Sequence, residues 1–188
     1  MSVTGWTGVV LVGGKSSRMG SDKALIQIDG RTMMDRALDL LEPHVQDLLV
    51  IGDPMKYGHA GPFVIADDMP GNGPLGGVVT AMRYASQDRL LVLACDMPNI
   101  NGRLLQFLQS EMGTRTDAVV PRHQGGLEPL AAAYHRRCES IFRERILSGS
   151  LKFSDALMDL RMATPLIEPG EQGWPEGLFR NLNHPSDL

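Results

Sequence analysis

Cysteine is scarce in this chain of 188 residues, which contains only Cys95 and Cys138. Two unpatterned cysteines supply neither a disulfide framework nor the ligands of a zinc site, and they fit a reducing compartment. Long apolar segments are also missing, because no run reaches the ~18–20 residues that span a bilayer. The first residues lack the basic stretch and apolar run of a signal peptide. We therefore expect a cytoplasmic protein without a membrane-embedded part.

The chain also lacks an excess of positive charge, since 18 lysines and arginines stand against 22 aspartates and glutamates. The formal net charge of -4 argues against a protein that binds nucleic acid through its phosphate backbone. The five histidines are scattered without metal-ligand spacing, and Glu128 stands in no ligand pattern either. Any anion site must therefore be formed locally by a few basic residues.

Short apolar runs alternate with helical patterns along most of the chain. Each run is closed by glycine, aspartate or proline, as expected of buried strands. The alternation predicts a three-layer, Rossmann-like α/β fold with a mostly parallel central sheet, whose ligands bind beyond the carboxyl ends of the strands. The apolar runs lie at residues 8–12, 48–51, 63–66 and 90–94, and the helical patterns at residues 32–41, 75–85 and 104–108.

The last third of the chain shows no internal repeat and no low-complexity run. It contains an apolar segment at residues 131–133 and a helical tract over residues 141–162. Because the total length suits one compact domain, we expect residues 1–188 to fold as a single unit.

The first apolar run leads directly into a glycine-rich, basic loop at residues 13–23. Its three glycines allow backbone amides to approach an anion, and Lys15, Arg18 and Lys23 supply positive charge. The loop is not a Walker A loop, because that alignment places Val9, inside the strand, where the first glycine belongs. The position predicts a phosphate-binding loop, with a solvated basic turn as the alternative.

Asp96 follows the apolar run at residues 90–94 and precedes Met97 and Pro98. Its carboxylate is expected at the carboxyl edge of the sheet, facing the first loop. Mg²⁺ binds one or two carboxylates together with phosphate oxygens and water, so Asp96 is the predicted metal ligand. A cap on the following helix is the alternative role for an aspartate at this position.

Gly71, Gly73 and Gly76 match the glycine spacing of a dinucleotide-binding loop, and Asp96 lies twenty residues after Gly76. An NAD-dependent oxidoreductase is therefore a competing hypothesis. In that fold, however, the first glycine follows its strand almost at once. Here residues 67–70 intervene and bring two carboxylates to the site where pyrophosphate would bind.

The segment LVGGKSSRMGSDKAL resembles the N-terminal signature L-x-G-G-x-S-x-R-M-G-x-D-K-x-L of the molybdenum cofactor guanylyltransferases. The resemblance spans essentially the whole chain and implies a nucleotidyltransferase version of the predicted fold. Its further motifs are Asp67, the glycine-rich residues 70–77, ACDMP at 94–98, EPL at 128–130 and NLNHPSDL at 181–188.

The resemblance also assigns residues to the site. It implies that GTP is bound by Leu11, Val12, Gly13, Lys23, Gly52, Asp53, Asp67 and Asp96, with Asp96 also holding Mg²⁺. The family has an asparagine beyond the second strand, where this chain has Gly52 and Asp53. Asn181 and Asn183 would place both amides on one face if they formed a strand, and amides match the donors and acceptors of a pterin. The family resemblance assigns this pair to molybdopterin, whereas the pattern alone fits a turn or cap.

The implied reaction transfers GMP from GTP to the phosphate of molybdopterin and releases pyrophosphate, with Arg18, Lys23 and Asp96 as the residues that carry it. Positioning and electrostatics suffice, because an ionised phosphate needs little general-base help. The alternatives are a molybdopterin cytidylyltransferase, a transferase acting on another small phosphorylated substrate, an NAD-dependent oxidoreductase and a non-catalytic nucleotide sensor. The expected partners are GTP, molybdopterin and, transiently, other proteins of molybdenum cofactor biosynthesis.

Gly13 is the residue expected to favour guanine. This chain reads L-V-G-G where the similar cytidine-using enzymes read L-A-A-G. A glycine leaves backbone and space for the larger purine, whereas an alanine methyl would crowd it.

Overall fold

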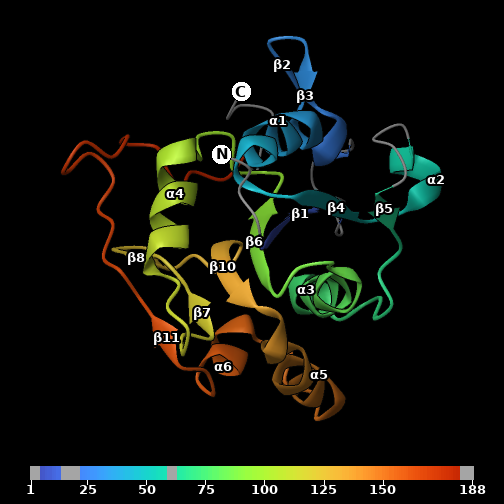
Figure 1. Cartoon of the computed structure of the whole chain (residues 1–188). Coiled ribbons are helices and arrows are strands. Elements are labelled where there is room, and N and C mark those ends of the chain that lie inside the picture. The colour runs from blue at the N-terminus through green and yellow to red at the C-terminus, as the bar shows by residue number, and fades with distance from the viewer. Residues whose placement is uncertain (1–4, 14–21, 59–62, 183–188) are drawn as a thin grey trace.

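The computed structural model describes residues 5–13, 22–58 and 63–182 (Figure 1). A seven-stranded sheet at its centre has the order β11-β7-β10-β6-β1-β4-β5. Only β10 runs antiparallel to its neighbours within this sheet, which confirms the predicted α/β fold with a mostly parallel sheet. Its strands are β1 (Trp6–Leu11), β4 (Asp47–Ile51), β5 (Val64–Ile65), β6 (Arg89–Ala94), β7 (Ala118–Val119), β10 (Ala131–His135) and β11 (Met162–Ala163).

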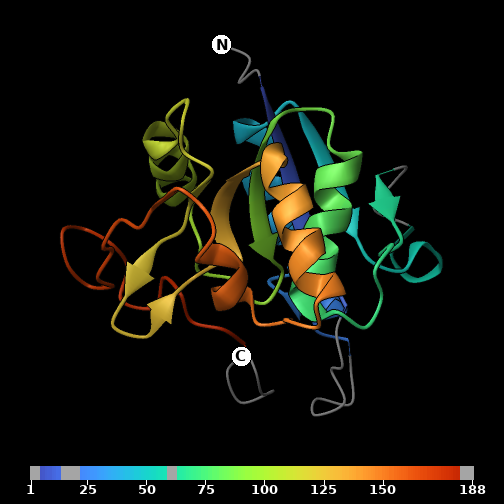
Figure 2. The ribbon, with the colours of Figure 1, turned by 90° about the horizontal axis from the view of Figure 1, so that it is seen from below.

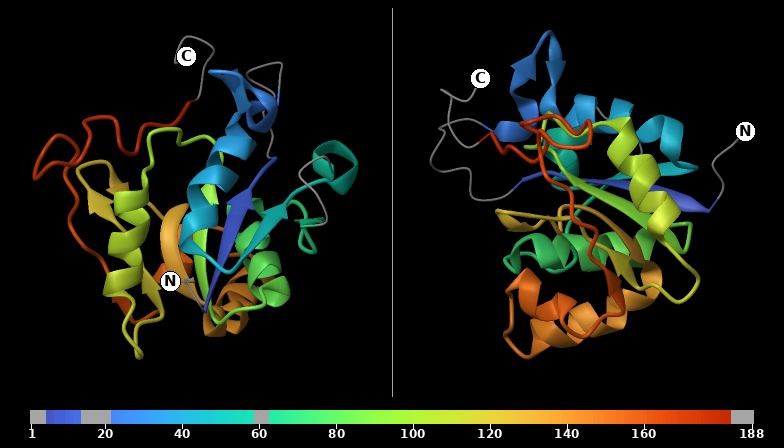
Figure 3. Two further views of the ribbon diagram at one scale, coloured as in Figure 1. Left: turned by 45° about the horizontal axis from the view of Figure 1, so that its top comes forward. Right: turned by 90° about the vertical axis from the view of Figure 1, so that its left-hand side faces the viewer.

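Helices cover both faces of the sheet, as the right-hand view of Figure 3 shows. On one face lie α1 (Met33–Leu41) and α4 (Gly102–Glu111); on the other lie α3 (Gly73–Tyr84), α5 (Glu139–Leu147) and α6 (Phe153–Leu157). Figure 2 shows α3 and α5 side by side on the same face of the sheet. Because side chains alternate along a strand, Val10 packs in the core on the face covered by α1 and α4, and Val9 packs in the core on the opposite face.

The register of the central strands fixes the functional edge. Leu11, the last residue of β1, lies opposite Ile51 of β4 and Ala94 of β6. Three parallel strands therefore end at one level, and the residues that follow them meet there.

Helix α1 begins and ends where the sequence predicts. The Thr32 hydroxyl caps it by accepting a hydrogen bond from the Asp35 amide at 3.0 Å, and the helix gives way to a short 3₁₀ segment at Pro43. The remaining short elements are η1 (Lys23–Leu25), β2 (Gln27–Ile28), β3 (Arg31–Thr32), η2 (Glu42–His44), α2 (Pro54–Tyr57), β8 (Arg122–His123), β9 (Gly126–Leu127) and η4 (Arg136–Cys138). No helix in the described part of the chain is both long and apolar enough to cross a membrane.

The single helical tract expected over residues 141–162 was wrong in part. Helix α5 ends at Leu147. Gly149 follows with a φ of 80°, and its amide donates a hydrogen bond to the Ile146 carbonyl at 2.9 Å. A glycine in this left-handed conformation ends a helix. The chain then forms α6 and finally a strand, in which Met162 pairs with Ala118.

Asp117 joins the elements at this end of the sheet. Its buried carboxylate accepts hydrogen bonds from Arg161 Nε at 2.9 Å and Arg137 Nε at 2.5 Å. The bonds from Arg161, and then those from Arg137, hold the pKa of Asp117 well below its usual range, although burial opposes them.

Asp117→Asn should therefore lower the free energy of unfolding by about 2–3 kcal/mol at pH 7, because two arginines lose a buried charged acceptor. A carboxyl group whose pKa is lowered by folding stabilises the folded state fully when the pH is above its pKa in the unfolded chain, ~3.9. This stabilisation is lost as the pH falls through the lower pKa of the folded state. Urea unfolding at pH 7 and pH 3 checks this. The difference between wild type and variant should narrow at pH 3 but persist, because the folded-state carboxyl, with its strongly lowered pKa, is still ionised there. The exposed Asp88→Asn is the control, and an equal effect of the two substitutions would contradict the role of Asp117.

Candidate active site

A cavity of about 900 Å³ lies at the carboxyl edge formed by β1, β4 and β6. Its walls come from the segments that follow these strands, from η1 and from the start of α3. All eight residues predicted to bind the nucleotide line it, namely Leu11, Val12, Gly13, Lys23, Gly52, Asp53, Asp67 and Asp96. The structure thus brings together residues from four separate parts of the sequence.

Lys23 and Asp96 face each other in this cavity. The Lys23 Nζ atom lies 3.4 Å from Asp96 Oδ2, and the side chains are 21% and 26% exposed. Lys23 opens η1, whereas Asp96 lies two residues beyond the end of β6. An ammonium group and a carboxylate therefore stand together, partly shielded, where a phosphate chain and its cation would meet.

Asp96 is the carboxylate that could hold Mg²⁺ here. Within the described residues, no cluster of three or more histidine, cysteine, aspartate or glutamate side chains could form a metal cage. Mg²⁺ bound to a triphosphate does not need such a cage, because phosphate oxygens and water complete its coordination around one or two carboxylates. The partly exposed carboxylate of Asp96, opposite Lys23, suits an ion that arrives with the nucleotide.

Asp22 links the start of η1 to α2. Its carboxylate accepts a hydrogen bond from Tyr57 Oη at 2.5 Å and forms an ion pair with Lys56. Burial raises the pKa of Asp22, but the bonds from Lys56 and Tyr57 outweigh it and lower the pKa. Burial and the Asp22 carboxylate raise the pKa of Tyr57, so its hydroxyl remains a donor. Sequence reasoning missed this link; the aspartate before Lys23 was its only signal.

Gly52 and Asp53 shape the wall beyond β4. A Cβ atom on Gly52 would lie 2.4 Å from Val12 Cγ2 and 2.9 Å from Tyr57 Cδ2, so only glycine fits. The Asp53 carboxylate accepts the Met55 amide at 2.9 Å and caps α2. Asp53 therefore has a structural role, and its contact with GTP stays a prediction.

Asp67 is held against α3. Its Oδ1 atom accepts hydrogen bonds from Thr80 Oγ1 at 2.8 Å and from the Met69 amide at 2.9 Å. Close by, a Cβ atom on Gly76 would lie 2.7 Å from the Met69 carbonyl oxygen, so this turn packs too tightly for a side chain. The glycine-rich segment forms a wall of the cavity beside Asp67.

The topology argues against a dinucleotide site at these glycines. Strand β5 ends at Ile65, and Gly71 comes six residues later. The strands before and after α3 are β5 and β6, which β4 and β1 separate in the sheet. In a dinucleotide fold these two strands are neighbours, and the acidic residue after the second lies beside the glycine loop. Here Asp96 pairs with Lys23 from the first loop instead.

The C-terminal segment reaches the same edge of the sheet. The Leu182 amide donates to the Asp96 carbonyl at 2.8 Å, and Asn99 Nδ2 donates to the Gly177 carbonyl at 2.9 Å. Asn181 is exposed and lies in irregular structure, so the strand considered for this pair is not present at Asn181 or Leu182. Arg18 and Asn183, also predicted site residues, lie outside the described residues.

Glu128 and Cys95 have structural explanations. The Gly125 amide donates to His123 Nδ1 at 3.0 Å, so His123 Nε2–H donates to Glu128, 2.7 Å away. The His123 ring stacks on Phe179 at 4.9 Å, which holds the C-terminal segment against the β8–β9 hairpin. Cys95 lines the cavity, but burial raises its pKa to about 12, so its thiol stays protonated and is no nucleophile.

Known proteins resemble this chain in sequence and structure. The family model of the MobA-like NTP transferase domain matches residues 8–157. A probable molybdenum cofactor guanylyltransferase from Bacillus cereus (strain Q1) is 37% identical over 138 residues, 70% of this chain and 69% of the relative. One from Pelotomaculum thermopropionicum is 34% identical over 97% of this chain and 89% of the relative. The crystal structure of molybdopterin-guanine dinucleotide biosynthesis protein A from Archaeoglobus fulgidus has a TM-score of 0.81 and 26% identity, with 96% of this chain and 94% of that chain covered.

Proposed function

Because the chain belongs to the MobA-like NTP transferase family, we propose that it transfers GMP from GTP to the phosphate of molybdopterin and releases pyrophosphate. One observation carries the proposal: the eight residues predicted to bind GTP line a single cavity, in which Lys23 Nζ and Asp96 Oδ2 lie 3.4 Å apart. The names of the similar proteins supply the nucleotide and the acceptor.

In the proposed reaction, an oxygen of the acceptor phosphate attacks the α-phosphorus of GTP in line. The new oxygen–phosphorus bond forms as the bond to the β-phosphate oxygen breaks, and pyrophosphate leaves with the electron pair. Lys23 places positive charge beside the phosphates, and the glycine-rich wall positions the nucleotide. No protein nucleophile is needed.

Asp96 is the residue that would hold Mg²⁺. When bound there, the ion would supply charge stabilisation to the triphosphate and its leaving group. The position of Asp96 opposite Lys23 supports this role, because the two side chains would offer charges of opposite sign to one phosphate–metal unit.

A direct test compares GTP, CTP, ATP and NAD under one Mg²⁺ concentration with molybdopterin as acceptor. The proposal expects pyrophosphate release with GTP and a product with the mass of the guanine dinucleotide. Faster turnover of CTP would make the chain a cytidylyltransferase. Tight binding of NAD without pyrophosphate release from any nucleotide would favour the oxidoreductase or sensor.

Gly13→Ala should lower kcat/KM for GTP by on the order of tenfold and affect CTP less. Among the described residues, only Tyr57 Oη would lie near a Cβ atom at Gly13, at 3.9 Å, so the methyl would point into the cavity and crowd the larger purine. Competition between GTP and CTP for wild type and variant measures the change. Gly5→Ala is the matched control, because Gly5 shares the positive φ (88° against 93°) but does not line the cavity. An unaltered GTP/CTP ratio would make Gly13 a structural glycine only.

Replacing both Asn181 and Asn183 with alanine should weaken molybdopterin binding at least about tenfold and leave GTP binding nearly unchanged. The hydrogen bond from the Leu182 amide to the carbonyl of Asp96, a residue that lines the cavity, supports this assignment for the preceding residue, Asn181. Separate titrations with each substrate provide the measurement. Equal losses for both substrates would contradict the assignment of these amides to the pterin.

A further inference from the structure

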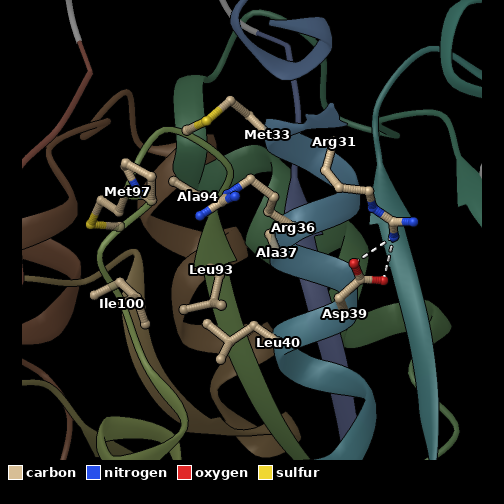
Figure 4. Close-up of a pocket in the computed structure, with 11 residues that line it drawn as sticks. Arg31, Met33, Arg36, Ala37, Asp39, Leu40, Leu93, Ala94, Met97 and Ile100 are labelled. Carbon is tan, nitrogen blue, oxygen red and sulfur yellow. Dashed lines mark hydrogen bonds and ion pairs between the residues drawn. The ribbon is translucent and has the colours of Figure 1, made fainter. Parts of the chain in front are cut away.

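A second pocket, of about 300 Å³, lies between α1 and the chain from Leu93 to Ile100 (Figure 4). It is distinct from the nucleotide cavity and shares only Ala94 with it. Apolar side chains make up most of its walls, including Met33, Leu40 and Ile100. The nucleotide reaction proposed above does not use this pocket.

Arg36 points into the pocket from α1, with its guanidinium group directed towards Ala94 in Figure 4. Its Nε atom is buried and has no hydrogen-bond partner among the described residues. The ion pair of Arg36 is loose, since Nη1 lies 3.8 Å from an oxygen of Asp29, whose side chain is 87% exposed. A buried donor on a charged group is costly to leave without an acceptor, and most such groups in proteins have one.

The other charged residues of the pocket neutralise each other. Arg31 Nη2 donates to both carboxylate oxygens of Asp39, at 2.6 Å and 2.5 Å. Figure 4 shows this pair together at the outer side of α1, turned away from Ala94. Because the charges of Arg31 and Asp39 cancel, Arg36 is the remaining charged side chain among the described residues that line the pocket.

We propose that this pocket binds a compact ligand that carries an oxyanion, either a phosphate monoester or a carboxylate, on an apolar or flat body. The oxyanion accepts hydrogen bonds from the Nη–H groups of Arg36, at the end of the guanidinium group that Figure 4 shows directed towards Ala94. The body of the ligand packs on Met33, Leu40 and Ile100. The volume lies at the lower end of the range for small-molecule sites, so it fits a ligand with one ring.

The test follows the arginine Nε–H signals of the full-length protein by ¹H–¹⁵N NMR during titration with phenyl phosphate. The Arg36 signal should shift with saturation. Arg36→Gln, and separately Ala37→Leu, which fills the pocket, should each weaken phenyl phosphate binding at least about tenfold. Lys23→Met should leave the affinity nearly unchanged, since it alters only the nucleotide cavity.

Several outcomes decide the proposal. An Arg36 signal that does not move, or an affinity that falls in Lys23→Met and not in Arg36→Gln, would overturn it. Inorganic phosphate binding as tightly as phenyl phosphate would contradict the apolar part of the site. Stronger binding of benzoate than of phenyl phosphate would identify the ligand class as carboxylates, and the reverse as phosphate monoesters. Circular dichroism confirms the fold of each variant, and Arg36→Gln serves as the decisive variant if Ala37→Leu does not fold.

Discussion

Asp96→Asn is expected to lower kcat for GMP transfer by on the order of 10³-fold, which corresponds to about 4 kcal/mol of lost transition-state stabilisation. Asparagine keeps the size of the side chain and one oxygen, but it removes the negative charge that Mg²⁺ requires. The substitution also removes the negative charge that lies 3.4 Å from Lys23 Nζ inside the cavity, so GTP binding without Mg²⁺ should not weaken. The variant should therefore bind the nucleotide and fail to turn it over.

Steady-state kinetics over a Mg²⁺ titration, combined with GTP binding in the absence of metal, provides the measurement. Asp68→Asn is the matched control, because it makes the same chemical change at a carboxylate that pairs with Arg83 and does not line the cavity. Its kcat should stay near the wild-type value. Near-wild-type turnover by Asp96→Asn at saturating Mg²⁺ would remove Asp96 from the metal site.

The location of the cavity could be predicted because it follows from parallel strands. The apolar runs ending near Leu11, Ile51 and Ala94 were readable in the sequence, and parallel strands place their carboxyl ends at one edge. The residues after them had to converge there, whatever the details of the loops. The roles of these residues came from the family resemblance, because strand patterns do not specify chemistry.

Side-chain pairings across distant segments could not be predicted in this way. Tyr57 and Asp22 are 35 residues apart, and their hydrogen bond depends on how α2 packs against η1. Arg36 reads in the sequence as an ordinary polar position of an amphipathic helix. Its Nε is buried, and Arg36 lines a pocket together with Met97 and Ile100, a long-range arrangement that helical periodicity does not encode.

The C-terminal third was predicted less well for a related reason. The tract from residue 141 to 162 has helical spacing, but Gly149 adopts a left-handed conformation that interrupts it. Met162 then joins the sheet beside Ala118. A two-residue strand has too few residues to show an alternating pattern, so only its partner strand defines it.

Lys23→Ala is expected to lower kcat/KM for GTP by roughly 30- to 1000-fold, or about 2–4 kcal/mol, by analogy with the loss of one donor to a developing negative charge. The same substitution leaves Asp96 without its ion-pair partner inside the cavity, which adds repulsion against the triphosphate. The variant should consequently need more Mg²⁺ for half-maximal rate. Kinetics with GTP at several Mg²⁺ concentrations measures both effects, and Lys152→Ala, at an exposed lysine outside the cavity, is the control.

Thermal unfolding separates a catalytic role of Lys23 from a structural one. A partly exposed ion pair such as Lys23–Asp96 stabilises a fold by at most about 1 kcal/mol, so the kinetic loss should clearly exceed any loss of stability. Lys23→Arg keeps the charge and should recover part of the activity, since a guanidinium group also pairs with phosphate but with different geometry. An unchanged kcat/KM for GTP in a folded Lys23→Ala protein would show that Lys23 only neutralises Asp96, and the charge on the phosphates would then have to be balanced elsewhere in the cavity.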